Sequence, residues 1–135
     1  MLFKADLITY YGVYRTIETE KLNVPTPEGR RTILSNHMPI MMPLEIGVME
    51  TSNNGKLSHY AINGGVLYFK DNRAELVLNN VIDVEEIVID KVLKEIEKVS
   101  GRLKKSKNEN ERIRFTYQLE VAENQLNAAR KYIKE

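Results

Sequence analysis

Apolar and polar residues alternate in short runs through the first part of the chain. Phe3, Ala5 and Leu7 are separated by the charged residues Lys4 and Asp6, and this period of two is typical of a strand with one buried face. Similar short runs occupy residues 22–24, 32–34, 46–50, 57–62, 66–69 and 74–78. Many short strands at close spacing predict an antiparallel sandwich or barrel.

Residues that favour tight turns separate these runs. All four prolines and six of the seven glycines precede residue 66. Asn54-Gly55 and Gly64-Gly65 supply the positive φ angles that hairpin turns require, and Asp71-Asn72 separates the last two runs. The sequence therefore predicts turns at these three places.

From about Val84 the apolar residues recur at helical spacing. One helix is predicted to begin near Asp83 or Asp90, either of which is a suitable N-cap, and to weaken at Ser100-Gly101. Its apolar face is formed by Ile89, Val92, Leu93, Ile96, Val99 and Leu103.

A second helix follows the polar stretch at residues 104–110. Its apolar residues are spaced 4, 3, 4, 3 and 4 apart, the pattern of a helix that packs along a nearly parallel axis, and they are Phe115, Leu119, Ala122, Leu126, Ala129 and Ile133. The sequence thus predicts an α+β protein, with an N-terminal antiparallel β-sandwich over residues 1–86 and a C-terminal two-helix hairpin over residues 87–135. A two-helix hairpin buries little apolar surface, so we expect it to be marginally stable and able to open.

The charge is divided unevenly between these parts. The formal net charge of +1 is the balance of −3 over residues 1–86 and +4 over residues 87–135. The basic side chains of the helical part indicate either a solvated face or a surface for an acidic protein partner. Nucleic acid is not expected as a partner, because Glu109, Glu111, Glu120 and Glu123 are interleaved with the basic residues and repel phosphates.

The residue inventory excludes several kinds of chemistry. There is no cysteine and there are only two histidines, so thiolate metal sites and a three-histidine site are ruled out and no metal site is expected. The phosphate-binding glycine motifs and the nucleophile elbow of hydrolases are absent. No apolar run is long enough to span a membrane and no signal peptide is visible, so we expect a cytosolic or membrane-peripheral protein.

Several local patterns occur together in a specific order. They are Ile8-Thr9-Tyr10-Tyr11-Gly12-Val13-Tyr14, Val24-Pro25-Thr26-Pro27-Glu28-Gly29, Ser35-Asn36-His37-Met38-Pro39, Pro43-Leu44-Glu45-Ile46-Gly47, Tyr60-Ala61-Ile62-Asn63-Gly64-Gly65-Val66-Leu67 and Ile89-Asp90. In this order and spacing the chain resembles the epsilon subunit of bacterial F-type ATP synthases over essentially its full length.

The resemblance implies a non-catalytic subunit of the central stalk. In that family the sandwich binds the gamma subunit and sits on the membrane-embedded ring of c subunits. The helical hairpin extends along gamma toward the alpha and beta subunits, where its basic helix meets acidic residues and inhibits ATP hydrolysis. The implied location is the cytoplasmic face of the bacterial cell membrane, and the coupling ion is a proton or a sodium ion.

The resemblance also assigns candidate binding residues. Arg30 and Arg31, which replace an acidic-apolar-glycine triplet of the family, are expected with His37, Met38, Pro39 and Ile40 in a loop next to the c ring. Candidates for the inhibitory contact are Arg112, Arg114, Arg130 and Lys131.

A nucleotide motif of some family members is only partly retained. Their Ile-Asp-x-x-Arg-Ala motif corresponds here to Ile89 and Asp90 followed by Leu93 and Lys94, so arginine is replaced by leucine and alanine by lysine. Ile89, Asp90 and Lys94 are the remaining candidates for binding ATP, but the replacements argue against it and no cofactor is expected.

Two other functions compete with the stalk subunit. One is a free-standing sensor that binds a small anion or nucleotide between the sheet and the hairpin. The other is an enzyme, which requires a buried acid or histidine in a formed pocket.

Overall fold

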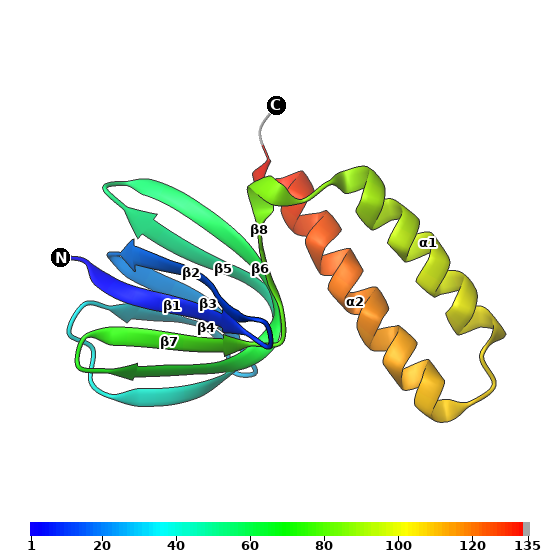
Figure 1. Cartoon of the computed structure of the whole chain (residues 1–135), viewed down its shortest axis with the longest axis horizontal. Coiled ribbons are helices and arrows are strands. Elements are labelled where there is room, and N and C mark those ends of the chain that lie inside the picture. The colour runs from blue at the N-terminus through cyan, green and yellow to red at the C-terminus, as the bar shows by residue number, and fades with distance from the viewer. Residues whose placement is uncertain (134–135) are drawn as a thin grey trace. The chain divides into compact units, whose positions relative to one another are not determined.

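The computed structural model describes residues 1–133 and divides the chain into two compact units, Met1–Asp83 and Val84–Glu135. The first unit contains eight strands and the second contains a short 3-10 helix and two α-helices, coloured from blue to red along the chain in Figure 1. Their bounds are β1 Phe3–Thr9, β2 Gly12–Thr19, β3 Lys21–Thr26, β4 Gly29–Leu34, β5 Ile40–Asn53, β6 Lys56–Lys70, β7 Arg73–Leu78, β8 Val81–Asp83, η1 Val84–Glu86, α1 Ile89–Lys105 and α2 Glu109–Tyr132.

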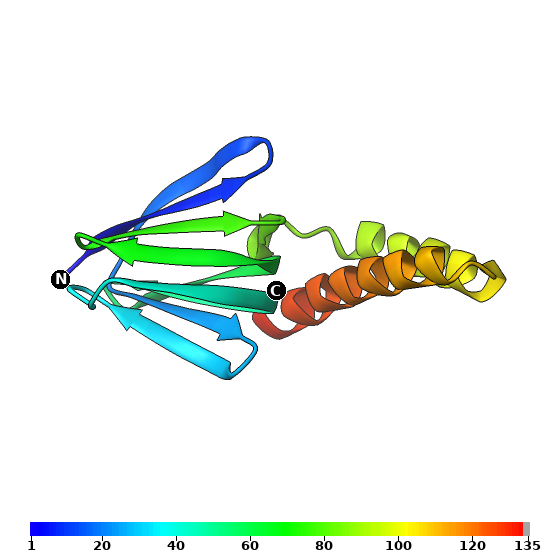
Figure 2. The same ribbon diagram turned by 90° about the horizontal axis from the view of Figure 1, so that it is seen from below.

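The strands of the first unit are joined by hydrogen bonds in the order β2-β1-β7-β6-β5-β3-β4, and β8 pairs with β6. Strands β5 and β6 are the longest, and they pair with each other along almost their whole length. The C-terminal half of β6 also pairs with β7, and its N-terminal half pairs with β8. Figure 2 shows the resulting fan of strand pairs in the sandwich. The predicted β-sandwich is confirmed, with one parallel pair, β1 and β7, among antiparallel ones.

Gly64 and Gly65 lie in the middle of β6, so the prediction of a hairpin turn there is wrong. Their φ angles are +92° and +149°, and a Cβ at Gly65 would lie 2.2 Å from the carbonyl oxygen of Val77. The pair keeps its register with β5, since Leu44 faces Gly65. The glycines therefore let β6 pass close to β7 where the strand changes its conformation. The other two predicted turns are confirmed, because Asn54, Gly55, Asp71 and Asn72 have positive φ angles between paired strands.

The sandwich core is one cluster of buried side chains drawn from almost every strand. The predicted alternation in β1 is confirmed, because Phe3, Ala5 and Leu7 are buried. Phe69 of β6 packs edge-on against Phe3 with ring centroids 5.4 Å apart. Other members include Leu22, Ile33, Met49, Ile62, Leu67 and Leu76.

The second unit is the predicted helical hairpin, with α1 and α2 packed along each other (Figure 1). In α2 the predicted apolar seam is largely buried, including Phe115, Ala122, Leu126 and Ala129. In α1 only Val92 and Val99 are buried, and Leu93 is 40% exposed, so its assignment to the packed face is wrong.

The start of α1 at Ile89 agrees with the prediction near Asp90, but the predicted N-cap and end of the helix are wrong. The helix begins after Val88, whose side chain cannot cap it, so neither Asp83 nor Asp90 is the N-cap. Asp90 lies in the first turn, where a carboxylate is favourable beside the positive end of the helix dipole. The helix continues through Ser100 and Gly101 to Lys105 instead of weakening there. Among the described residues, neither helix is long and apolar enough to cross a membrane.

Candidate functional site

The six residues predicted for one loop lie at two ends of the sandwich. Arg30 and Arg31 are at the start of β4, next to the turn at residues 27–28. Arg30 Nε donates a 2.6 Å hydrogen bond to Asn23 Oδ1, and Arg30 Nη2 donates to the Asn23 carbonyl at 3.2 Å. These contacts hold Arg30 along the hairpin, and Arg31 is exposed beside it.

His37, Met38 and Pro39 form the connection at the opposite end of β4, and Ile40 is the first residue of β5. The connection is held to the turn between β6 and β7, because the Asn36 amide donates to Asn72 Oδ1 at 2.6 Å. The His37 ring packs edge-on near Phe69 at 6.0 Å between centroids. The length of β4 therefore separates the two arginines from His37, Met38, Pro39 and Ile40.

An exposed apolar face extends from this connection across β5, β6 and β7. Met38 and Met41 are 71% and 65% exposed, while Met42 and Met49 are buried in the core. Met41 faces Tyr68 across the strand pair, and Tyr68 faces Glu75 of β7. Pro39, Ile40, Met41 and Tyr68 line part of a shallow groove with Phe69, Lys70 and Glu75. We call Met38, Met41, Tyr68 and Val77 the β5–β7 patch.

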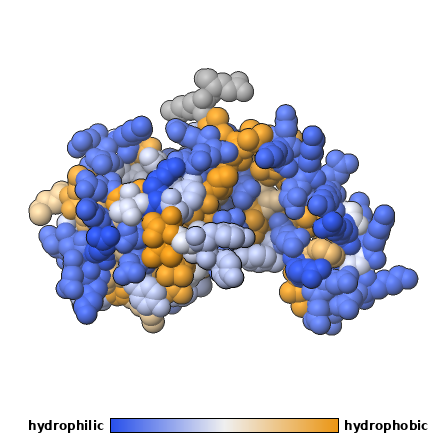
Figure 3. Space-filling model, in the orientation of Figure 1, coloured by the Kyte–Doolittle hydropathy of each residue, from blue (hydrophilic) through white to orange (hydrophobic). Residues whose placement is uncertain are grey.

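Tyr68 and Val77 were not predicted as surface residues. Both are nearly half exposed although they stand in runs of apolar residues. The available signal was the period of two in β7, where Ala74, Leu76 and Leu78 face inward and leave Val77 outside. Figure 3 shows apolar side chains among polar ones on the visible face of the sandwich.

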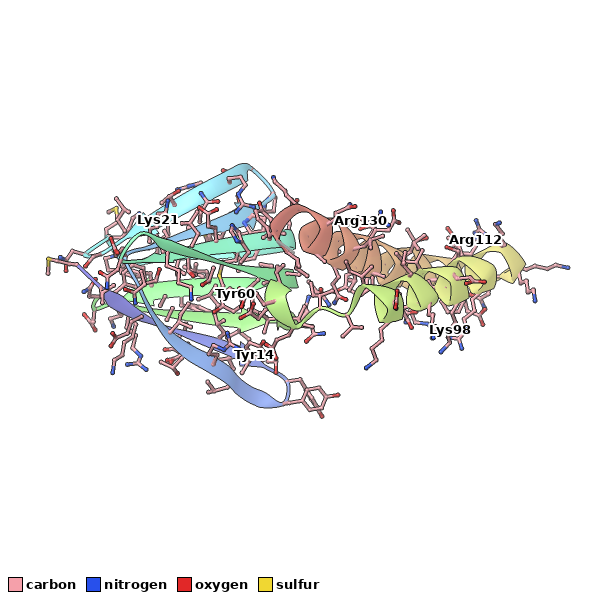
Figure 4. All side chains as sticks on the ribbon, turned by 90° about the horizontal axis from the view of Figure 1, so that it is seen from above. Tyr14, Lys21, Tyr60, Lys98, Arg112 and Arg130 are labelled. Carbon is pink, nitrogen blue, oxygen red and sulfur yellow. The ribbon has the colours of Figure 1, made fainter. Side chains whose placement is uncertain are left out.

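A charged cluster fixes the last strand of the sandwich to β2. Arg15 Nη1 donates to Asp83 Oδ2 at 2.8 Å and to the Tyr60 hydroxyl at 3.3 Å. The Arg15 guanidinium also lies near the rings of Tyr14 and Tyr60, which Figure 4 labels. The hydrogen bond that Arg15 donates to Asp83 raises the pKa of Arg15 above its usual value. The cluster anchors the end of β8, immediately before the helical unit.

The four basic residues predicted for an inhibitory contact lie in two pairs near opposite ends of α2, Arg112 with Arg114 and Arg130 with Lys131. Figure 4 shows Arg112 and Arg130 at opposite ends of the helix. Arg112 Nη1 donates to the carbonyl oxygens of Leu103 and Ser106, at 3.1 and 3.2 Å, and so closes the turn between the helices. The Arg114 guanidinium lies over the Phe115 ring, and Lys131 Nζ lies over the Tyr132 ring. The structure does not bring the four together.

The three nucleotide candidates lie on the first two turns of α1. Ile89 is half-buried, whereas Asp90 and Lys94 are exposed and make no ion pair with any described residue. Lys94 borders a shallow groove that α1 forms by itself. Over residues 1–133, no cluster of three or more His, Cys, Asp or Glu side chains is arranged to hold a metal ion.

Exposed apolar and basic surfaces on two separately folded units are typical of a subunit that binds other proteins. Residues 2–84 match the family model of the ATP synthase delta/epsilon chain, beta-sandwich domain. The chain is 28% identical to the ATP synthase epsilon chain of Lactobacillus gasseri, over 97% of this chain and 94% of that protein. It is 30% identical to the epsilon chain of Caldicellulosiruptor bescii, over 94% of this chain and 93% of that protein.

Solved structures show the same fold. A chain in the Euglena gracilis mitochondrial ATP synthase, resolved with OSCP, F1 and the c-ring, superposes with a TM-score of 0.77 at 23% identity, covering 94% of this chain and 81% of that chain. A chain of the central stalk and c-ring of the Tetrahymena thermophila mitochondrial enzyme gives 0.64 at 15% identity, covering 93% and 95%. The protein belongs to the family of ATP synthase epsilon chains, which are non-catalytic subunits of the central stalk.

Proposed function

We propose that this chain connects the gamma subunit to the c ring through its sandwich and inhibits ATP hydrolysis through its helical hairpin. Its partners are then gamma, the c ring and, when the hairpin is extended, the alpha and beta subunits. It acts at the cytoplasmic face of the bacterial membrane. The observation that carries the proposal is the division at Asp83 and Val84 into two compact units in a chain of this family. Such a division allows one unit to stay bound while the other moves.

The β5–β7 patch is the proposed docking surface for gamma. A stable protein interface needs an exposed apolar centre, and aromatic and methionine side chains are enriched in such centres. Met41 and Tyr68 meet this requirement on the neighbouring strands β5 and β6, and Met38 adds to them from the connection before β5. Lys70 and Glu75 line the same groove as Met41 and Tyr68. Met38 was expected beside the c ring together with His37, Pro39 and Ile40; here we propose instead that Met38 contacts gamma as part of the patch.

The turn between β3 and β4 is the proposed contact with the c ring. Arg30 is held in place by Asn23, and Arg31 is free to reach a polar loop. Two cations at this turn favour carboxylates or carbonyl oxygens on the ring loops. His37 and Pro39 lie at the other end of β4 and are left out of this contact.

The hairpin is the proposed inhibitory element. Its helices bury few large side chains against each other, and Ala122 and Ala129 contribute little apolar area to the seam. The free energy that keeps the hairpin folded is accordingly small, so contacts with a partner can shift it to another conformation. Control of this step by ATP through Asp90 and Lys94 is not part of the proposal.

The test compares the full chain with residues 1–86 on an ATP synthase complex stripped of its epsilon chain. ATP hydrolysis and ATP-driven ion pumping are measured after adding back each form. We expect both forms to bind and restore pumping, and only the full chain to inhibit hydrolysis. Inhibition by residues 1–86 alone would place regulation in the sandwich and contradict the hairpin proposal.

A matched pair of variants tests the gamma contact. Met41→Ser with Tyr68→Ser removes the centre of the β5–β7 patch, while Leu57→Ser changes an equally exposed apolar residue at the other end of β6. We expect the double variant to weaken binding to gamma at least about tenfold and Leu57→Ser to leave it unchanged. If the unchanged chain, the double variant and Leu57→Ser all bind gamma equally well, the patch is ruled out as the docking surface.

A further inference from the structure

The outward face of α1 carries a continuous row of basic side chains. Its members are spaced 3, 4, 4 and 3 residues apart, which places them on one side of a helix. All are exposed, and they lie away from the buried residues Val92 and Val99. We call this row the α1 stripe; it consists of Lys91, Lys94, Lys98, Arg102 and Lys105.

The positive charge of the stripe is not compensated within the described part of the chain. None of its side chains makes a salt bridge or hydrogen bond there. Over its whole length α1 has six basic residues against three carboxylates, whereas α2 has four against four. The excess of basic over acidic residues in the two helices therefore lies on α1. The residues predicted from the sequence for the inhibitory contact were all on α2.

The stripe borders a shallow groove. Lys94, Lys98, Arg102 and Lys105 line it together with Glu97 and Gly101. A Cβ at Gly101 would meet nothing within 4 Å, so the missing side chain leaves a hollow between the basic residues. A glycine inside a helix costs stability relative to alanine, and this one opens space on the charged face instead of relieving a close approach.

We propose that the α1 stripe is a docking surface for an acidic protein segment of the ATP synthase complex. The inference rests on the proposed inhibitory function of the hairpin and specifies which of its faces makes the contact. Carboxylates on one face of a partner helix repeat at the same spacing as the basic residues of the stripe. The partner segment lies along α1, and its side chains enter the hollow at Gly101.

The residues beside the stripe favour a narrow protein segment over a flat anionic surface. Glu95 and Glu97 lie on either side of the basic row and repel a wide surface such as a lipid membrane or a nucleic-acid duplex. Membrane binding by an amphipathic helix also requires an apolar face, and that of α1 is occupied because Val92 and Val99 are buried in the hairpin.

The basic residues of α2 are less suited to the same role. Arg112 is engaged by the carbonyl oxygens of the turn, and Arg114 lies over Phe115. Arg130 and Lys131 lie in the last turn, far from Arg112. A partner segment therefore meets five cations in one row on α1, whereas the cations of α2 form two pairs near opposite ends of the helix.

Two triple variants of the full chain with equal loss of charge test the proposal. One carries K94Q, K98Q and R102Q in the stripe, and the other carries R114Q, R130Q and K131Q in α2. Binding to the stripped complex and inhibition of its ATP hydrolysis are measured at low and high salt. We expect the stripe variant to bind about tenfold more weakly with a reduced salt dependence, and the α2 variant to change by less than about threefold. Helical circular dichroism of each variant confirms that the hairpin still forms.

A further variant tests the hollow without changing charge. Gly101→Gln fills the space between the basic residues, and we expect it to weaken binding while leaving α1 helical. An equal or larger effect of the α2 variant would overturn the proposal, as would unchanged binding of both the stripe variant and Gly101→Gln. Stripe-dependent binding to vesicles of anionic phospholipid, without such binding to the stripped complex, would overturn it in favour of a lipid partner.

The same measurements separate this inference from the proposed function. If the unchanged chain binds through the stripe but does not inhibit hydrolysis, the inhibitory function fails and the docking surface stands. If the unchanged chain inhibits hydrolysis and the stripe variant inhibits equally well, the inhibitory function stands and the docking surface fails.

Discussion

The sandwich and the hairpin are stabilised in different ways. The sandwich core unites large side chains from distant parts of the chain, such as Leu7, Ile33 and Phe69. The hairpin buries two valines on α1, and three of the five buried residues on α2 are alanines. Because apolar stabilisation grows with buried area, each contact in the hairpin contributes less.

This difference fits the separate tasks proposed for the two units. A core built from contacts between distant strands is lost as a whole, whereas two helices joined by a short turn can separate without disturbing the sandwich. The proposed anchoring by the sandwich and the proposed regulation by the hairpin can then coexist in one chain, because two compact units can unfold separately.

The largest expected effect on the stability of the sandwich is that of Gly65→Ala. The new Cβ would lie 2.2 Å from the Val77 carbonyl oxygen and 2.8 Å from the Leu78 Cα, both in the backbone of β7. We expect the free energy of unfolding of the sandwich to fall by more than about 3 kcal/mol, as measured by urea denaturation. The matched control is Gly55→Ala, where φ is also positive but a Cβ meets nothing within 4 Å. Its loss should be about 1 kcal/mol, and equal losses would show that close packing at Gly65 is unimportant.

The second test acts on the hairpin alone. Leu126→Ala removes one of the few large buried side chains of α2, with an expected cost of about 2–3 kcal/mol to the hairpin. Helical circular dichroism should be lost at a lower temperature, while the unfolding transition of the sandwich stays in place. Ile113→Ala serves as the control, because that side chain is 63% exposed. Simultaneous loss of both transitions in Leu126→Ala would contradict the independence of the two units.

The turn between the helices gives a smaller test. Arg112→Gln removes two hydrogen bonds to the Leu103 and Ser106 carbonyl oxygens, and we expect the hairpin to lose about 1 kcal/mol. Arg114→Gln removes the same charge but no hydrogen bond of the turn, so it should cost less. Amide hydrogen exchange of residues near the turn measures both. Faster exchange in Arg114→Gln than in Arg112→Gln would show that Arg112 does not close the turn.

The sequence predicted features that depend on local residues. The turns at Asn54-Gly55 and Asp71-Asn72 follow from local φ preferences, and the seam of α2 follows from helical spacing. The role of Gly64-Gly65 depends instead on where β7 lies, which no local pattern records. Likewise Asp90 is a good N-cap residue by propensity, but the path of the chain starts α1 at Ile89.

Binding residues were harder to predict than elements. Arg30 and His37 are close in sequence, but β4 runs between them and separates them by its length. Arg112 carries a charge typical of a contact surface, yet the backbone of the preceding turn engages it. Sequence shows which residues are charged, whereas the fold determines which of these charges are available to a partner.

The smallest test concerns a charged pair that joins β1 to β7 in the sandwich. Arg73 donates to both carboxylate oxygens of Asp6, at 2.9 to 3.1 Å, and the Thr16 hydroxyl donates to Asp6 Oδ1 at 2.7 Å. The Thr16 hydrogen bond, followed by Arg73, lowers the pKa of Asp6 below its usual value. A lowered pKa in the folded state adds stability above the unfolded value near 4, and this stability is lost as the pH falls through the folded pKa.

Asp6→Asn should therefore destabilise the sandwich by about 0.5–1 kcal/mol at pH 7, a small effect because half of the Arg73 side chain is exposed to solvent. The difference from the unchanged chain should shrink as the pH falls below about 4, where Asp6 becomes protonated in the unfolded chain, and it should be smallest below the lowered pKa of the folded state. Urea denaturation at several pH values measures it, and Glu28→Gln in an exposed turn is the control. A difference that stays constant with pH would mean that Asp6 acts through packing and not through its charge. The helical signal of the hairpin should be unchanged at pH 7, because Asp6, Thr16 and Arg73 all belong to the sandwich.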